Sequence, residues 1–186
     1  PGYCMTRMAP TFYMGGMNPQ YPQFGMLMRY VQRTAHLIST GVHQADVALL
    51  YPAEADWAGC AVRPMDEVAM CMARNGIDFD FIPSDALYAQ AAVQEGKLQV
   101  NQEEYRMLVV PMTESLPVQL AQTLAQLAEN GLPVVFTDAR PSRVSDDSIP
   151  LGDLLAKCGC MPLHALPAAI KPKLVSTNDG ARASLR

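Results

Sequence analysis

The residues whose side chains could react as nucleophiles or metal ligands are mainly five cysteines. They are Cys4, Cys60, Cys71, Cys158 and Cys160. None belongs to a Cys-x-x-Cys pair beside histidines, so the sequence predicts no zinc site. A single glycine separates Cys158 from Cys160, a spacing that redox chemistry could use. Buried or unreactive thiols are the preferred interpretation, because nothing in the sequence marks either thiol for activation.

Two acids, Glu54 and Asp56, lie close together between Tyr51 and Gly59. A pair of carboxyl groups can act as acid and base when a rigid scaffold holds them at a fixed separation. These two share one loop, so we expect them to be solvated or to cap the next element. The histidines have no partner that the sequence identifies and are interpreted as structural; they are His36, His43 and His164.

Composition excludes several classes of protein. The chain has 186 residues, of which 49% are hydrophobic and 17% are charged, and its formal net charge is −4. This is enough apolar material for a core. The Lys and Arg residues are scattered, which argues against a nucleic-acid partner. The sequence has neither an apolar run of about 18 residues nor a basic N-terminal region followed by an apolar one, so no membrane segment is predicted. The compartment stays open, with the cytoplasm preferred.

The elements that must position these residues alternate between short apolar segments and amphipathic helices. Strands are predicted at residues 47–51, 77–82, 107–110 and 133–137, and a small hairpin element at 97–100. Helices are predicted at residues 24–40, 64–74, 86–93, 118–129 and 151–157. Ser115 is placed to cap the fourth of these helices. The alternation predicts an α/β fold with an open, doubly wound parallel sheet of four or five strands, which is flavodoxin-like.

In such a sheet, ligands bind outside the carboxyl ends of the strands, which here are the loops after Tyr51, Ile82, Val110 and Thr137. The segment 111–115 (PMTES) is not the glycine-flanked elbow that a hydrolase or amidotransferase nucleophile needs. Pro111 stands where a phosphoacceptor receiver would carry aspartate. The acids of the first loop would repel the phosphates of a flavin or dinucleotide. No cofactor and no metal are therefore predicted.

Three segments together carry a resemblance to a known group of enzymes. They are residues 12–22 (FYMGGMNPQYP), 51–59 (YPAEADWAG) and 77–82 (IDFDFI). They resemble large bacterial glycoside hydrolases in which a (β/α)₈ barrel is followed by a β-galactosidase trimerisation-like domain. That domain is flavodoxin-like, of the class I glutamine amidotransferase-like type. The resemblance implies an end-of-barrel loop and helix at 1–44, the accessory domain at 45–165 and a linker at 166–186.

The resemblance also implies candidate sugar contacts. Asn18, Gln20 and Tyr21 would border the sugar site, because amides and phenols suit sugar hydroxyls and faces; alternatively, the amides satisfy the backbone of their own loop. Glu54 is a further candidate contact. Trp57 would stack on sugar or pack against the barrel, and packing is preferred. The catalytic carboxyl groups of such enzymes come from earlier barrel strands, so none is assigned here.

The leading hypothesis is therefore a non-catalytic accessory or oligomerisation domain of a glycoside hydrolase. Because the chain begins at Pro1 without an initiator Met, we expect it to be a piece of a longer protein. Its expected partners are the catalytic barrel of the same polypeptide, a carbohydrate substrate and further copies of the chain. One alternative is a free-standing small-molecule binding or regulatory module of the same fold. Another is an amidotransferase-like enzyme with an unrecognised nucleophile.

Overall fold

The computed structural model describes residues 18–41, 43–145 and 151–170 of the chain. The described residues divide into two units, residues 18–41 and residues 43–170 without 146–150. Each unit is described by itself. Among the described residues, no helix combines the length and the apolar character that a membrane span needs.

The described part of the first unit is a single long helix preceded by a short turn. The 3-10 turn η2 (Tyr21–Gln23) leads directly into α2 (Phe24–Ser39), as the spacing of apolar residues predicts. The rings of Tyr21 and Phe24 stack with their centroids 5.9 Å apart. None of the residues of α2 is buried, although its apolar stripe includes Leu27, Tyr30 and Ile38.

The second unit is built on a parallel sheet of five strands, which lie in the order β10-β8-β6-β1-β2. Their bounds are β1 Val47–Tyr51, β2 Phe79–Pro83, β6 Met107–Val110, β8 Val134–Thr137 and β10 Gly159–Met161. Every pairing among them is parallel, with Val47 opposite both Phe79 and Met107. Counted along the chain, the order is 2-1-3-4-5, which is the flavodoxin-like order. The predicted fold class is confirmed.

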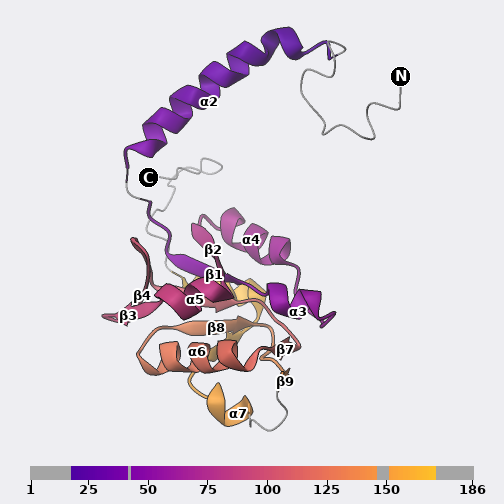
Figure 1. Ribbon diagram of the computed structural model, residues 1–186, viewed down its shortest axis with the longest axis vertical. Coiled ribbons are helices and arrows are strands. Elements are labelled where there is room, and N and C mark those ends of the chain that lie inside the picture. The colour runs from indigo at the N-terminus through magenta and orange to yellow at the C-terminus, as the bar shows by residue number, and fades with distance from the viewer. Residues whose placement is uncertain (1–17, 42, 146–150, 171–186) are drawn as a thin grey trace. The chain divides into compact units, whose positions relative to one another are not determined.

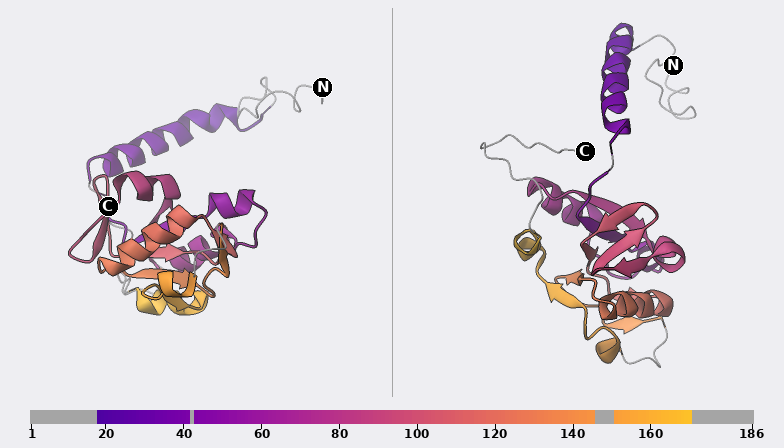
Figure 2. Two further views of the ribbon diagram at one scale, coloured as in Figure 1. Left: turned by 60° about the horizontal axis from the view of Figure 1, so that its bottom comes forward. Right: turned by 90° about the vertical axis from the view of Figure 1, so that its left-hand side faces the viewer.

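Helices cover both faces of this sheet, as Figure 1 shows for α4 and α6 on opposite sides of β1 and β8. The helices are α3 Ala53–Trp57, α4 Met65–Arg74, α5 Ser84–Gln90, α6 Val118–Glu129, α7 Leu151–Leu154 and α8 Leu166–Ala169, with the 3-10 turn η3 at Leu163–Ala165. Figure 2 shows the same unit from two further directions. Only a sheet covered on both faces makes wholly apolar strands such as β1 and β6 favourable.

The core has two parts, one on each face of the sheet, because successive residues of a strand point to opposite faces. Ala48 and Leu50 of β1 belong to a cluster that includes buried leucines of α5 and α6. Val47 and Leu49 belong to the other cluster, with Val68 of α4. The single five-residue strand β1 thus anchors both halves of the core.

A small antiparallel sheet follows α5 and contains β3 (Ala92–Gln94), β4 (Lys97–Val100) and β5 (Glu103–Tyr105). The hairpin element expected at 97–100 is therefore the middle strand of three. The helix expected at 86–93 begins earlier and ends at Gln90, because Ala91 is already extended. Leu98 and Tyr105 are buried against the main core.

Two features of the second unit differ from expectation. Ser115 does not cap α6: it begins the short strand β7 (Ser115–Leu116), which pairs with β9 (Arg143–Val144), and Pro117 holds the cap position without a side-chain bond. The amide of Val118 instead donates to Oγ of Ser145, at 3.2 Å. Beyond residue 165, Leu166 is fully buried in the core with Val47 and Val68, and Ile170 is nearly so. The packed region thus continues to Ile170, and residues 171–186 lie outside the described part.

Candidate functional site

The carboxyl ends of β1 and β6 form the place where a doubly wound sheet offers a crevice to ligands, because the chain leaves these neighbouring strands toward opposite faces. In this chain, residues 61–63 run across the end of β6. Val62 and Thr113 form an antiparallel bridge. The amide of Arg63 donates to the carbonyl of Met112 at 2.7 Å, and the amide of Glu114 donates to the carbonyl of Ala61 at 2.7 Å. The crevice is therefore crossed by backbone of the chain itself.

Asp138 joins three segments at the same edge of the sheet. It follows β8 directly and has a positive φ of 61°, a conformation that Asp tolerates better than most residues. Its amide donates to the carbonyl of Met161 at 2.8 Å, and its Oδ1 accepts from the amide of Leu163 at 3.1 Å. Its Oδ2 lies 2.7 Å from Nε of Arg63, which also pairs with Glu67. The acid is thus occupied by structural partners.

Glu114 forms a second ionic contact at this edge. One carboxylate oxygen accepts from the amide of Ala61 at 3.1 Å, and the other lies 3.4 Å from Nε of Arg143. The backbone hydrogen bond from Ala61 and then the charge of Arg143 lower the pKa of Glu114. A terminal nitrogen of Arg143 also lies 3.7 Å from Sγ of Cys60. Glu114 is therefore held in its charged form, which can accept but not donate a proton.

Glu54 lies at the start of α3 and contacts the helix that follows β2. Its Oε1 accepts a short hydrogen bond from the hydroxyl of Ser84. Its Oε2 is buried and has no hydrogen-bond partner among the described residues. Burial and then the charge of Glu54 raise the pKa of Tyr88, while the nearby Ser84 opposes this shift. Glu54, Ser84 and Tyr88 thus form one connected polar group.

Trp57, the other candidate sugar contact of the first loop, lies on the surface. Trp57, at the end of α3, is 81% exposed, and Asp56 beside it is also exposed. The structure therefore does not bring Glu54 and Asp56 together as a pair around one enclosed space. Nε2 of His43, a residue interpreted from sequence as structural, lies 2.9 Å from Oδ2 of Asp80.

Asn18, Gln20 and Tyr21 belong to the first unit, just before α2. Oδ1 of Asn18 accepts from the amide of Gln20 at 2.9 Å, and the carbonyl of Asn18 accepts from the amide of Tyr21 at 3.1 Å. Asn18 thus satisfies backbone groups of its own turn, while Gln20 is exposed and Tyr21 is 41% exposed. The preceding residues of that segment, 12–17, lie outside the described part.

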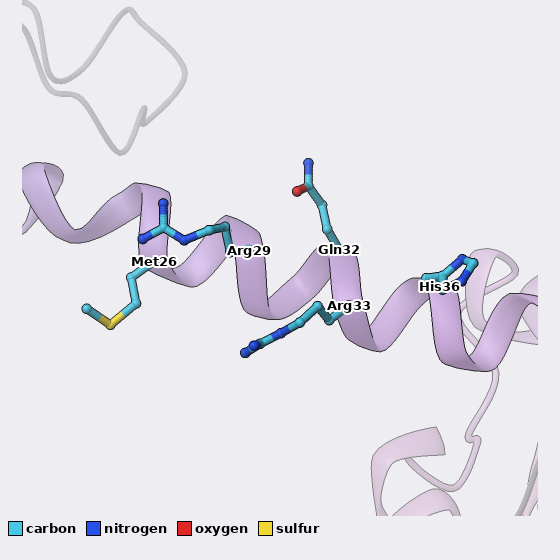
Figure 3. Close-up of a pocket in the computed structure, with 5 residues that line it drawn as sticks. All are labelled: Met26, Arg29, Gln32, Arg33 and His36. Carbon is cyan, nitrogen blue, oxygen red and sulfur yellow. The ribbon is translucent and has the colours of Figure 1, made fainter.

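A concavity runs along α2 itself. It is lined by Met26, Arg29, Gln32, Arg33 and His36. Figure 3 shows these side chains leaving the helix in different directions instead of converging on one point. A single helix supplies one wall only, so these residues alone do not define a catalytic arrangement.

Comparison with protein families supplies the assignment that the geometry alone does not. The sequence model of glycoside hydrolase family 106, described as α-L-rhamnosidase, matches residues 2–154. The chain belongs to glycoside hydrolase family 106. A search of curated proteins finds no match. The match covers most of the chain, so the carbohydrate-related assignment made from residues 12–22, 51–59 and 77–82 is supported at the level of a glycoside hydrolase.

The family 106 chain also contains polar residues that sequence reasoning missed. Arg63, Asp138, Glu114 and Arg143 meet at one edge of the sheet although they are distant in sequence. The sequence gives one signal for Asp138, which follows directly on a predicted strand. It gives none for its partner Arg63. No group of three or more possible metal ligands occurs among the residues that the structure describes.

Proposed function

We propose that this chain is the α/β accessory domain of a family 106 enzyme that hydrolyses α-L-rhamnosides, and that bond cleavage takes place elsewhere in the polypeptide. In this proposal a (β/α)₈ catalytic barrel precedes the second unit. Residues 1–44 supply its last loop and helix, and the rest of the packed chain, from residue 45 to residue 170, forms a β-galactosidase trimerisation-like domain. The family match and the flavodoxin-like strand order support this arrangement.

The observation that carries the non-catalytic role is the segment 61–63, which crosses the end of β6. Its bridge from Val62 to Thr113 and the backbone bonds of Arg63 and Glu114 occupy the crevice that a ligand would enter in a related fold. Opening the crevice would break these bonds and expose their backbone groups. The segment therefore favours a structural use of this edge.

The acids of the same edge support this role. Glycoside hydrolysis commonly needs one carboxyl group that is protonated and one that is charged. Glu114 has a lowered pKa and pairs with Arg143, and Asp138 pairs with Arg63 and accepts from Leu163. A proton donor needs the opposite environment, one that raises the pKa of the carboxyl group. These two acids are better suited to holding segments together.

The surface features suit contact with a neighbouring domain. Trp57 is the only tryptophan of the chain and is 81% exposed, and the edge strand β2 exposes Phe81 to 51%. Large exposed aromatic side chains commonly mark interaction sites. We infer that Trp57 packs against the barrel of the same polypeptide. Asn18, Gln20 and Tyr21 would then border the sugar, and further copies of the chain could assemble through exposed apolar side chains.

The test is the hydrolysis of an aryl α-L-rhamnoside by this chain alone and by the full polypeptide that contains it. We expect release of the aryl group only from the full polypeptide. Turnover by the isolated chain that survives repeated purification and is abolished by unfolding would overturn the proposal.

A second measurement addresses the inferred contact of Trp57. Oxidative labelling followed by mass spectrometry should modify Trp57 readily in the isolated chain and much less in the full polypeptide. Met70 of α4, which is 47% exposed, provides a comparison within the same molecule. Equal oxidation of Trp57 in both proteins would contradict the packing role.

A further inference from the structure

A groove between α5 and α6 is separate from the strand ends described above. Its volume is about 200 Å³, and residues of both helices and of the start of β3 line it. Four polar side chains come from α6 and the residue that follows it: Gln119, Thr123, Gln126 and Asn130. They recur at three- and four-residue intervals, which places them on one face of the helix. Tyr88 lines the groove from α5.

The chemistry of this lining selects an uncharged ligand. Every described residue that lines the groove is neutral, so a phosphate or a carboxylate would find no countercharge there. Amide and hydroxyl groups can both donate and accept, which matches the hydroxyl groups of a sugar. Tyr88 and the buried Leu127 supply the apolar surface that the C–H face of a sugar ring prefers.

The size of the groove limits the ligand to about one ring. A cavity of about 150 Å³ accommodates benzene, and this groove has about 200 Å³. Tyr88 is partly buried and packs against the main core. A residue fixed in this way loses less freedom when a ligand binds.

We propose that the α5–α6 groove binds a single neutral sugar unit, separately from any site where the glycosidic bond is cleaved. Gln119, Gln126 and Asn130 bond its hydroxyl groups, and Tyr88 contacts its ring. The inference goes beyond the accessory role proposed above and does not depend on it, because it requires only that a sugar reaches this surface. A groove of this kind would hold a carbohydrate chain near the enzyme during repeated cleavage.

The test is a titration of the isotope-labelled chain with methyl α-L-rhamnoside, followed by amide resonances. We expect saturable shifts centred on Tyr88, Thr123 and Gln126. Gln126→Ala should weaken binding about fivefold, the effect of losing one hydrogen bond of typical strength. Gln122→Ala is the matched control, since Gln122 is exposed on the same helix but does not line the groove. It should leave the affinity unchanged.

Three results would overturn the proposal. They are the absence of saturable shifts at α5 and α6, equal weakening by both substitutions, and shifts centred instead on Asn18 to Tyr21 or on Trp57. Glycerol at the same concentration of hydroxyl groups should give no saturable shifts, and equal shifts with glycerol would also count against a sugar site. The readout is binding, so hydrolytic activity of the isolated chain would contradict the accessory role without affecting this result.

Discussion

The guanidinium Nε of Arg63 lies 2.7 Å from Oδ2 of Asp138, and this pair connects the crossover after β1 with the end of β8. Both side chains are about one-quarter to one-third exposed. Because Asp138 also accepts from the amide of Leu163, the pair extends to the segment after β10. One acid thereby fixes three loops at the edge of the sheet where activity is usually found in this fold.

Removing the side chain of Asp138 should destabilise the second unit. Asp138→Ala loses the ion pair and the bond from Leu163 and leaves alanine at a positive φ, and we expect a cost of about 2 kcal/mol. Asp138→Asn keeps a residue that tolerates this conformation and should cost about 1 kcal/mol. Urea unfolding measures both values. Asp66→Ala, at an exposed acid of α4, should stay within about 0.5 kcal/mol of the parent.

The stability of the chain should depend on the ionisation of Glu114. Its pKa in the folded state is lowered below the ordinary 4.5. The charged form therefore contributes stability that is present above pH 4.5 and is lost as the pH falls through the lowered value. Glu114→Gln removes this contribution, so the difference from the parent should shrink on acidification. Unfolding measured between neutral and acidic pH tests the trend.

A second substitution separates the two main causes of the lowered pKa of Glu114. Arg143→Leu removes the charge but leaves the hydrogen bond from the amide of Ala61 to Glu114. The pKa of Glu114, followed by carboxyl resonances, should then rise only part of the way toward 4.5. A pKa of 4.5 or more in the parent chain would contradict the assigned contacts.

Ser145, not Ser115, should be the serine that supports the start of α6. Ser145→Ala removes the acceptor of the amide of Val118, and we expect a loss of about 1 kcal/mol. Ser115→Ala should cost less than Ser145→Ala, because the amide of Val118 is not bonded to Ser115. Thermal unfolding of the two variants side by side makes the comparison. A larger loss of stability for Ser115→Ala would support Ser115 as the cap of α6, as the sequence predicts.

The segment after residue 165 should be necessary for the fold. Leu166→Ala opens a cavity next to Val47 and Val68, and a buried leucine of this kind costs about 3 kcal/mol. Leu37→Ala is a matched control, because Leu37 is 75% exposed on α2. The free energy of unfolding of the second unit should be unchanged by the control. Similar values for the two variants would show that Leu166 is not part of the core.

The fold could be predicted largely because two of its central strands are wholly apolar. β1 and β6 are apolar from end to end and lie between neighbouring strands, as a sheet covered on both faces requires. The edge strand β10 was missed, since Gly159–Met161 is short and contains glycine, which has a low preference for strands. Ser115 was misassigned because the pairing of β7 with β9 is not visible in local sequence.

The site was predictable only in outline. The loops after the strands could be named, because strand ends meet at one edge whatever their order. The partners could not, since Arg63 meets Asp138 only after the sheet has placed β8 beside β6. The polar face of α6 that lines the groove could not be recognised, because any amphipathic helix has a polar face and only the packing of α5 beside α6 makes this one the wall of a groove.

The position of β1 in the sheet also affects how the chain folds as it is synthesised. Its second neighbour, β6, is translated only after the three-stranded insert, and at synthesis rates of about 5–20 residues per second the delay lasts several seconds. During that time α4, which is made first, is the element able to shield Val47 and Leu49. Defects in α4 should therefore reduce the yield of soluble protein more than they reduce the stability of molecules that have already folded.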